Sequence, residues 1–160
     1  MDILLRTIMM GGIDGIITIF SIISSIEATK LNYKYIFILG LGTLLSSAIS
    51  MGVGEYVSVK AEKDYKSNKT IPLNNGIIMF LSFIGFGLIP LIIYYLALKL
   101  NYKNKFTNSY ISILLALFIL GTIKSKYTKD NWVIGGGSVA IYGGLASFLA
   151  YNVSKLLSKF

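Results

Sequence analysis

The sequence predicts an all-α membrane protein, and three observations support this prediction. Of its 160 residues, 54% are hydrophobic and only 14% are charged, with a mean hydropathy of +0.70, whereas soluble domains average about 25% charged residues. The apolar residues form continuous runs without the period-2 alternation of a β-barrel strand. The length of each run is close to that of a helix that crosses a bilayer, about 20 residues. We therefore expect residues 1–160 to form one transmembrane domain of five helices.

The first three spans are expected at residues 7–26, 35–54 and 76–98. The first contains one charged residue, Asp14, and continues through a full span, which is longer than the apolar core of a signal peptide. The second and third contain no charged residue. The segment between them, residues 55–75, is rich in lysine and acidic residues and is expected to be a solvated loop.

The last two spans are expected at residues 106–123 and 132–151, between polar segments too short to hold a separate domain. Both the first and the last span contain small residues four apart, a spacing that favours close packing of helices. These residues are Gly11 and Gly15 in the first span and Gly136, Ala140 and Gly144 in the last.

The composition also excludes several classes of function. The chain has no Cys and no His, so disulfides, thiolate or imidazole metal sites and Ser-His-Asp triads are ruled out. Its net charge of +8 comes from lysines between the apolar runs, where they bind lipid headgroups more readily than nucleic acid. No phosphate-binding loop, nucleophile elbow or cofactor motif is present. We therefore expect no enzymatic activity, no cofactor and no nucleic-acid partner.

The charge distribution says little about orientation. The 15 basic residues divide almost evenly between the two sides of the membrane, with a slight excess that favours a cytosolic N-terminus. With five spans, the two termini must lie on opposite sides.

In the segment 55–75, Glu62 and Asp64 alternate with lysines and are expected to form part of a solvated charge cluster.

Asp14 is the first candidate functional residue. An aspartate near the centre of a bilayer costs about 2.5–3.5 kcal/mol on insertion scales, so it needs a partner or a function. Met10 and Thr18 lie one turn before and after Asp14 on the same helical face, which makes them candidate pore-lining residues. The structural alternative is an aspartate that binds backbone groups of a neighbouring helix.

The second span has a related polar face. Thr43, Ser47, Met51 and Glu55 recur every four residues and therefore share one side of a helix. Oxygen ligands alone suit Mg²⁺ and Ca²⁺, whereas an added sulfur shifts the preference toward transition metals. This face predicts Fe²⁺ or Mn²⁺ as cargo, with Thr43 and Ser47 as candidate pore-lining residues. The alternative for Met51 is that it fills the core.

Two segments that contain these residues resemble a known family. Residues 12–18 (GIDGIIT) and 50–58 (SMGVGEYVS) are similar to the two signature segments of the vacuolar iron transporter family. Residues 83–91 (FIGFGLIPL) resemble its third span, and residues 120–144 resemble its fourth and fifth. The resemblance follows the order of the family and covers nearly the whole chain.

The resemblance implies a five-helix protomer that forms a homodimer, with the ion path at the dimer interface and the N-terminus in the cytosol. Members of the family export Fe²⁺, and often Mn²⁺, from the cytosol in exchange for protons. The chain would then be a multi-pass protein of a vacuolar membrane, another internal membrane or the plasma membrane. Asp14 and Met51 match the positions of the intramembrane metal ligands, and Glu55 matches a position at the cytosolic mouth.

The chain departs from better-known members of the family in one respect. Those members carry a long, glutamate-rich helical insertion between the second and third spans, which captures metal in the cytosol. Here residues 55–75 are too few to contain it. One hypothesis is therefore a minimal transporter that keeps only the membrane part. The alternative is a non-transporting scaffold or a passive metal channel that requires a partner.

Overall fold

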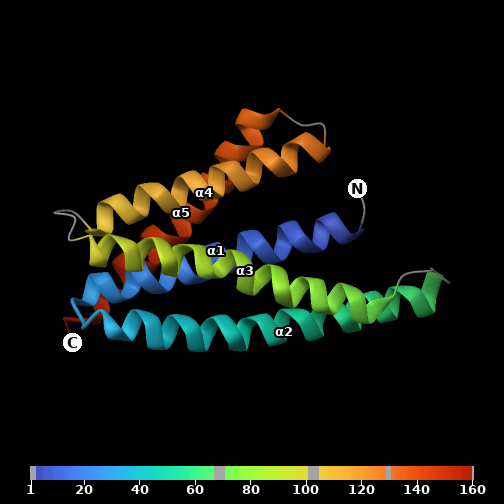
Figure 1. Ribbon diagram of the computed structural model, residues 1–160, viewed down its shortest axis with the longest axis horizontal. Coiled ribbons are helices and arrows are strands. Elements are labelled where there is room, and N and C mark those ends of the chain that lie inside the picture. The colour runs from blue at the N-terminus through green and yellow to red at the C-terminus, as the bar shows by residue number, and fades with distance from the viewer. Residues whose placement is uncertain (1–2, 67–70, 101–104, 129–130, 160) are drawn as a thin grey trace.

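The structure, a computed structural model, describes residues 3–66, 71–100, 105–128 and 131–159. Within these ranges the chain folds as helices without strands: α1 (Ile3–Thr29), α2 (Lys34–Lys66), α3 (Pro72–Lys99), α4 (Lys105–Thr128) and α5 (Trp132–Leu157). All five are long and apolar enough to cross a membrane. Consecutive helices run in opposite directions, and the two chain ends lie at opposite ends of the bundle (Figure 1). The predicted fold class is confirmed.

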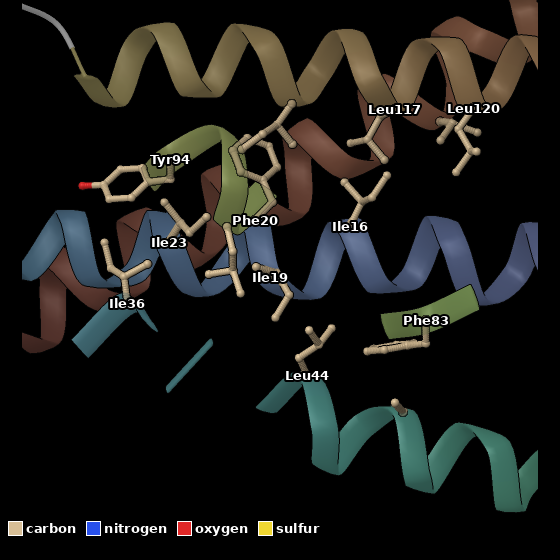
Figure 2. Close-up of a cluster of buried hydrophobic side chains, with 14 of the residues drawn as sticks. Ile16, Ile19, Phe20, Ile23, Ile36, Leu44, Phe83, Tyr94, Leu117 and Leu120 are labelled. Atoms are coloured by element: carbon tan, nitrogen blue, oxygen red, sulfur yellow. The ribbon is translucent and has the colours of Figure 1, made fainter. Parts of the chain in front are cut away.

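The first helix occupies the centre of the bundle. The most apolar stretch of α1 is 56% buried, compared with 22–33% for the corresponding stretches of the other helices. Helix α1 also contacts all four of these helices. Its side chains Ile16, Ile19, Phe20 and Ile23 are almost completely buried and contribute to the core together with residues of the surrounding helices (Figure 2). A polar residue on α1 is therefore placed in the middle of the molecule.

Glycines allow the helices to approach one another closely. A Cβ on Gly15 of α1 would lie 2.6 Å from the carbonyl oxygen of Phe83 in α3, and one on Gly136 of α5 would lie 2.7 Å from the Cγ2 of Thr122 in α4. Such distances leave no room for a side chain. The predicted packing role of the small residues is confirmed at Gly15 and Gly136.

The prediction for residues 55–75 was wrong over most of this segment. Helix α2 continues to Lys66 and has 33 residues, which gives it a length of about 50 Å. Glu62 and Asp64 therefore lie on its last turns and not in a loop. Hydropathy marks where an apolar span ends, but lysine, glutamate and alanine are good helix formers, so the helix continues beyond that point. The other helices also run past their expected spans at one or both ends.

The helix ends explain how neighbouring helices are connected. Lys30 follows α1 with a φ of 56°, a left-handed conformation that ends a helix, and α2 begins a few residues later at Lys34. Pro72 stands at the start of α3, where its missing N–H is not needed. Asn131 caps α5 by accepting a hydrogen bond from the backbone N–H of Val133 at 3.0 Å. These short connections keep consecutive helices antiparallel.

Candidate metal centre

One side of α1 carries oxygen- or sulfur-containing side chains along most of its length. Its members are three or four residues apart and therefore lie on one side of the helix. They are Thr7, Met10, Asp14, Thr18, Ser21 and Ser25, and we call this side the α1 polar face. Met10 is 52% exposed, and Asp14, Thr18 and Ser21 are half-buried. The central part of this face is thus only partly covered by the rest of the chain.

Asp14 lies near the centre of this face and has no partner among the residues that the structure describes. Its carboxylate is half-buried and makes no hydrogen bond or ion pair with any residue that the structure describes. Successive residues are 100° apart around a helix, so Gly15, which contacts α3, holds that helix to one side of Asp14. The structural alternative, an aspartate bonded to the backbone of a neighbouring helix, is not what the described residues show.

The second polar face lies on α2 and consists of Thr43, Ser47, Met51 and Glu55. The first three are half-buried, and Glu55 is buried. Met51 packs partly against the hydrophobic core and remains partly accessible, so core filling accounts for some of its surface but not all of it. We call this the α2 polar face.

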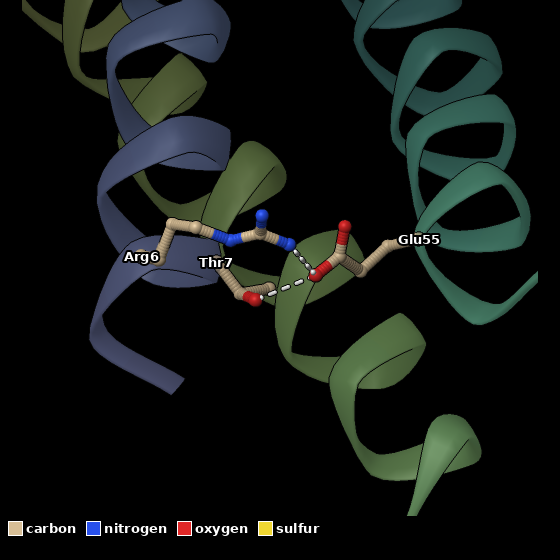
Figure 3. A network of polar contacts seen from close by, with 3 residues as sticks. All are labelled: Arg6, Thr7 and Glu55. Atoms are coloured by element: carbon tan, nitrogen blue, oxygen red, sulfur yellow. Dashed lines mark hydrogen bonds and ion pairs between the residues drawn. The ribbon is translucent and has the colours of Figure 1, made fainter. Parts of the chain in front are cut away.

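Glu55 is held by two residues of α1 (Figure 3). The hydroxyl of Thr7 donates a hydrogen bond of 2.8 Å to its Oε1. The guanidinium of Arg6 lies 3.4 Å from the same oxygen. The other oxygen, Oε2, points away from Thr7 (Figure 3) and receives no hydrogen bond from the described residues. Oε1 is thus fixed by two contacts, and Oε2 has none with the described residues.

The contact between Thr7 and Glu55 sets the register of the two polar faces. Because α1 and α2 are antiparallel (Figure 1), moving forward along α1 corresponds to moving backward along α2. At 1.5 Å per residue, Met51 lies about 6 Å along the bundle from the level of Glu55, and Asp14 lies about 10 Å from it. Ser47 lies about 12 Å from that level. The candidate ligands therefore follow one another from the end of the bundle toward its middle.

One protomer does not assemble a complete metal site from acidic residues. Among the described residues, no group of three or more Asp, Glu, His or Cys side chains lies together. The acidic residues of the two polar faces, Asp14 and Glu55, lie at different levels. Divalent metal ions in proteins take about four to eight ligands, so a bound ion would need further donors beside Asp14.

The sequence reasoning did not identify Arg6, Thr7, Ser21 or Ser25 as candidates. Ser21 and Ser25 could have been found, because they continue the spacing of Asp14 and Thr18. Ser25 also donates to the carbonyl of Ala150 in α5 at 3.4 Å, which no sequence pattern indicates. The contacts of Arg6 and Thr7 with Glu55 depend on how α1 and α2 pack.

The chain matches a family of membrane proteins along most of its length. The model of the VIT family matches residues 5–71 and 65–155. The two matched stretches overlap at residues 65–71, just at and beyond the end of α2.

Curated relatives show the same coverage at moderate identity. A "Vacuolar iron transporter" of Plasmodium berghei is 28% identical over 223 residues, which cover 96% of this chain and 82% of the relative. A protein of the same name from Toxoplasma gondii is 27% identical over 95% of this chain and 74% of the relative. The "Vacuolar iron transporter homolog 2" of Arabidopsis thaliana is 24% identical over 166 residues, or 96% of this chain and 84% of the relative. The Plasmodium alignment is longer than the 160-residue chain, whereas the Arabidopsis alignment is close to its length.

Proposed function

Because this chain belongs to the VIT family, we propose that it transports a divalent transition metal ion across a membrane, with Fe²⁺ as the main cargo and Mn²⁺ as a second one. It is an integral membrane protein with five spans. The relatives that cover most of the chain are named as iron transporters. The proposed ligands are Asp14, Met51 and Glu55, and the proposed pore-lining residues are Met10, Thr18, Thr43 and Ser47.

The single observation that carries this proposal is Asp14, which is half-buried on the most buried helix and lacks a partner among the described residues. A carboxylate in this position is unfavourable unless it binds something. A divalent cation is a suitable partner, because Thr18 and Met10 on the same face offer an additional oxygen and a sulfur.

We propose that a second copy of the chain supplies the missing ligands. Beside the α2 polar face lies a row of small exposed residues, Gly42, Ser46, Ser50 and Gly54. Apart from the neighbouring part of α2 itself, no described atom lies within 4 Å of the Cβ positions of Gly42 and Gly54. Rows of small residues let membrane helices pack closely. In a homodimer paired along α1 and α2, two Asp14 carboxylates and two Met51 sulfurs would surround one ion.

The order of the candidate ligands suggests a direction of transport. With the N-terminus in the cytosol, Glu55 would receive the ion at the cytosolic mouth, and Met51 and Asp14 would bind it deeper in the membrane. A carboxylate binds either a metal ion or a proton, so protonation of Asp14 from the far side would release the cation. The metal ion would thus leave the cytosol in exchange for protons that move into it. The membrane crossed would be a vacuolar membrane, another internal membrane or the plasma membrane.

The proposal of a passive channel or scaffold that needs a partner remains the second candidate. It is favoured by the length of the Plasmodium alignment, because the chain lacks residues that this relative has within the aligned region. The Arabidopsis relative aligns over nearly the length of this chain, so not every relative has them. A scaffold, however, would not need an aspartate in its most buried helix that lacks a partner among the described residues.

The test is metal uptake into proteoliposomes, recorded for Fe²⁺ and Mn²⁺ together with the lumenal pH. We expect Asp14→Asn to abolish uptake while the protein remains folded. Asp64→Asn is the matched control, because it makes the same chemical change on an exposed residue of α2. Uptake by the wild type with counter-moving protons supports the transporter. Metal flux without proton movement supports the channel, and no flux from folded protein supports the scaffold. Normal uptake by Asp14→Asn contradicts the proposed site.

A further inference from the structure

A cavity of about 460 Å³ lies between the C-terminal end of α3 and the first turns of α4. It is at the end of the bundle opposite Glu55, because consecutive helices are antiparallel (Figure 1). Leu96 and Leu100 of α3 and Ile111 of α4 contribute apolar wall, whereas Asn108 and Ser109 contribute polar groups. The cavity is therefore amphipathic.

Ser109 has a buried hydroxyl without a hydrogen-bond partner in the part of the chain that the structure describes. The residue is 2% exposed, and its Oγ is the one buried side-chain polar atom without a hydrogen-bond partner among the described residues. The neighbouring Ser112 behaves differently, since its hydroxyl donates to the carbonyl of Asn108 at 2.9 Å. A buried donor without an acceptor is unfavourable. Because Ser109 lines the cavity, an acceptor located there would satisfy it.

The charges around the cavity favour an anionic acceptor. The sequence contains no acidic residue from position 65 to position 129, a stretch that includes both helices of the hairpin. Lys99 is exposed in the last turn of α3, and α4 begins at Lys105, so its positively polarised N-terminus lies at this end. The described acidic residue of α1 at this end is Glu27, and it is already hydrogen-bonded to the hydroxyl of Tyr94. The described charges of α3 and the dipole of α4 at the cavity are therefore positive.

We propose that this cavity binds an anionic phospholipid of the surrounding leaflet. Its phosphate accepts the hydrogen bond of Ser109 near the start of α4, and an acyl chain lies against Leu96, Leu100 and Ile111. The apolar wall favours an amphiphile over a free anion, and the chain lies in a bilayer that supplies amphiphiles. The site is separate from the proposed ion path and does not depend on which ion is carried.

The experiment compares lipid-dependent thermal stability of the purified, delipidated protein in detergent. The added probes are phosphatidylglycerol, phosphatidylcholine with the same acyl chains, and inorganic phosphate. At about 100-fold excess over the dissociation constant, phosphatidylglycerol should raise the wild-type Tm by about 5–10 °C. Ser109→Ala should lose at least half of this shift while its Tm without lipid is not lowered, because the hydroxyl has no partner to lose. Ser138→Ala, whose hydroxyl donates to the carbonyl of Ile134, should behave as wild type.

Three outcomes would overturn the proposal. Equal shifts with phosphatidylglycerol and phosphatidylcholine would mean that the cavity does not select the anionic headgroup. An equal shift with inorganic phosphate would identify a site for a soluble anion. A full phosphatidylglycerol shift in Ser109→Ala would show that lipid binds elsewhere. All three are independent of metal transport, so a failed uptake experiment leaves this test unaffected.

Discussion

The polar residues of the α4–α5 pair differ from those of the α1 and α2 polar faces in how their hydrogen bonds are satisfied. In α4 and α5, several side chains donate to a backbone carbonyl three or four residues earlier: Ser112, Thr122, Ser138 and Asn152. On the other faces Asp14, Thr18, Thr43 and Ser47 make no such bond to any described residue.

This difference separates polar residues that the fold uses from those that it leaves available. A serine hydroxyl that already donates a hydrogen bond to a carbonyl of its own helix contributes to the structure of that helix. A hydroxyl or carboxylate without such a bond is available as a ligand, as Asp14 is on the α1 polar face and Ser47 on the α2 polar face, and as Ser109 is in α4. The α4–α5 pair packs against α1, and under the proposed function the α1–α2 pair would carry the ion path.

The largest expected effect is that of Asp14→Asn. Removing the charged ligand should lower metal uptake by at least about 100-fold, beyond the effect of losing an outer-sphere partner. The Tm should not fall, because the carboxylate has no partner among the described residues to lose. Uptake and differential scanning fluorimetry measure the two effects. A lower Tm together with normal uptake would show that Asp14 stabilises the fold and does not bind the ion.

Met51→Leu should change selectivity more than stability. Leucine fills a similar volume but removes the sulfur, so the preference for Fe²⁺ and Mn²⁺ over Mg²⁺ should fall by about 10-fold. Competition of Mg²⁺ against Mn²⁺ uptake measures the ratio. Met79→Leu is the matched control, because Met79 is buried at 1% exposure and lies beside Gly11 in the α1–α3 contact. The same loss of selectivity in both variants would point to general packing.

Arg6→Gln tests the cytosolic end of the path. The guanidinium lies 3.4 Å from Glu55 and competes with an incoming cation, so its removal should lower the KM for metal by about two- to fivefold, as expected for a partly exposed ion pair. The effect should shrink at high salt. Lys60→Gln is the control, since Lys60 is exposed on the same helix as Glu55 and lies over Tyr56. A raised KM in Arg6→Gln would show that Arg6 assists binding.

Ser47→Ala should have the smallest effect. If its free hydroxyl contributes one weak contact to the ion, uptake should fall about two- to threefold. Ser138→Ala should leave uptake unchanged, because that hydroxyl is bonded to the carbonyl of Ile134. Parallel uptake measurements decide the point. Equal effects in the two variants would remove the functional distinction between bonded and free hydroxyls.

Much of this organisation was predictable from the sequence. Apolar runs predict the spans, and i+4 spacing predicts that Asp14 shares a face with Thr18, and Met51 with Glu55, because these are properties of a single helix. The assignment of Asp14, Met51 and Glu55 to a metal path stays a prediction that the proposed variants test.

The features that escaped prediction involve two helices or a boundary. The contact of Thr7 with Glu55 depends on the register of α1 against α2, and the close approach at Gly15 depends on α3. The continuation of α2 to Lys66 was missed because a hydropathy pattern reports the edge of the membrane and not the end of a helix. Ser109 and Ser112 cannot be distinguished by sequence, although only the Ser112 hydroxyl has a hydrogen-bond partner among the described residues.

The central position of α1 has a consequence for the order in which the protein is made. The helix that is surrounded by all the others leaves the ribosome first, and α5, one of its main neighbours, leaves last. Until then Ser24 of α1 lacks its hydrogen-bonding partner, Ser147 of α5. Assembly in the bilayer must therefore hold the earliest helix in an incomplete environment, and the final helix closes the bundle around it.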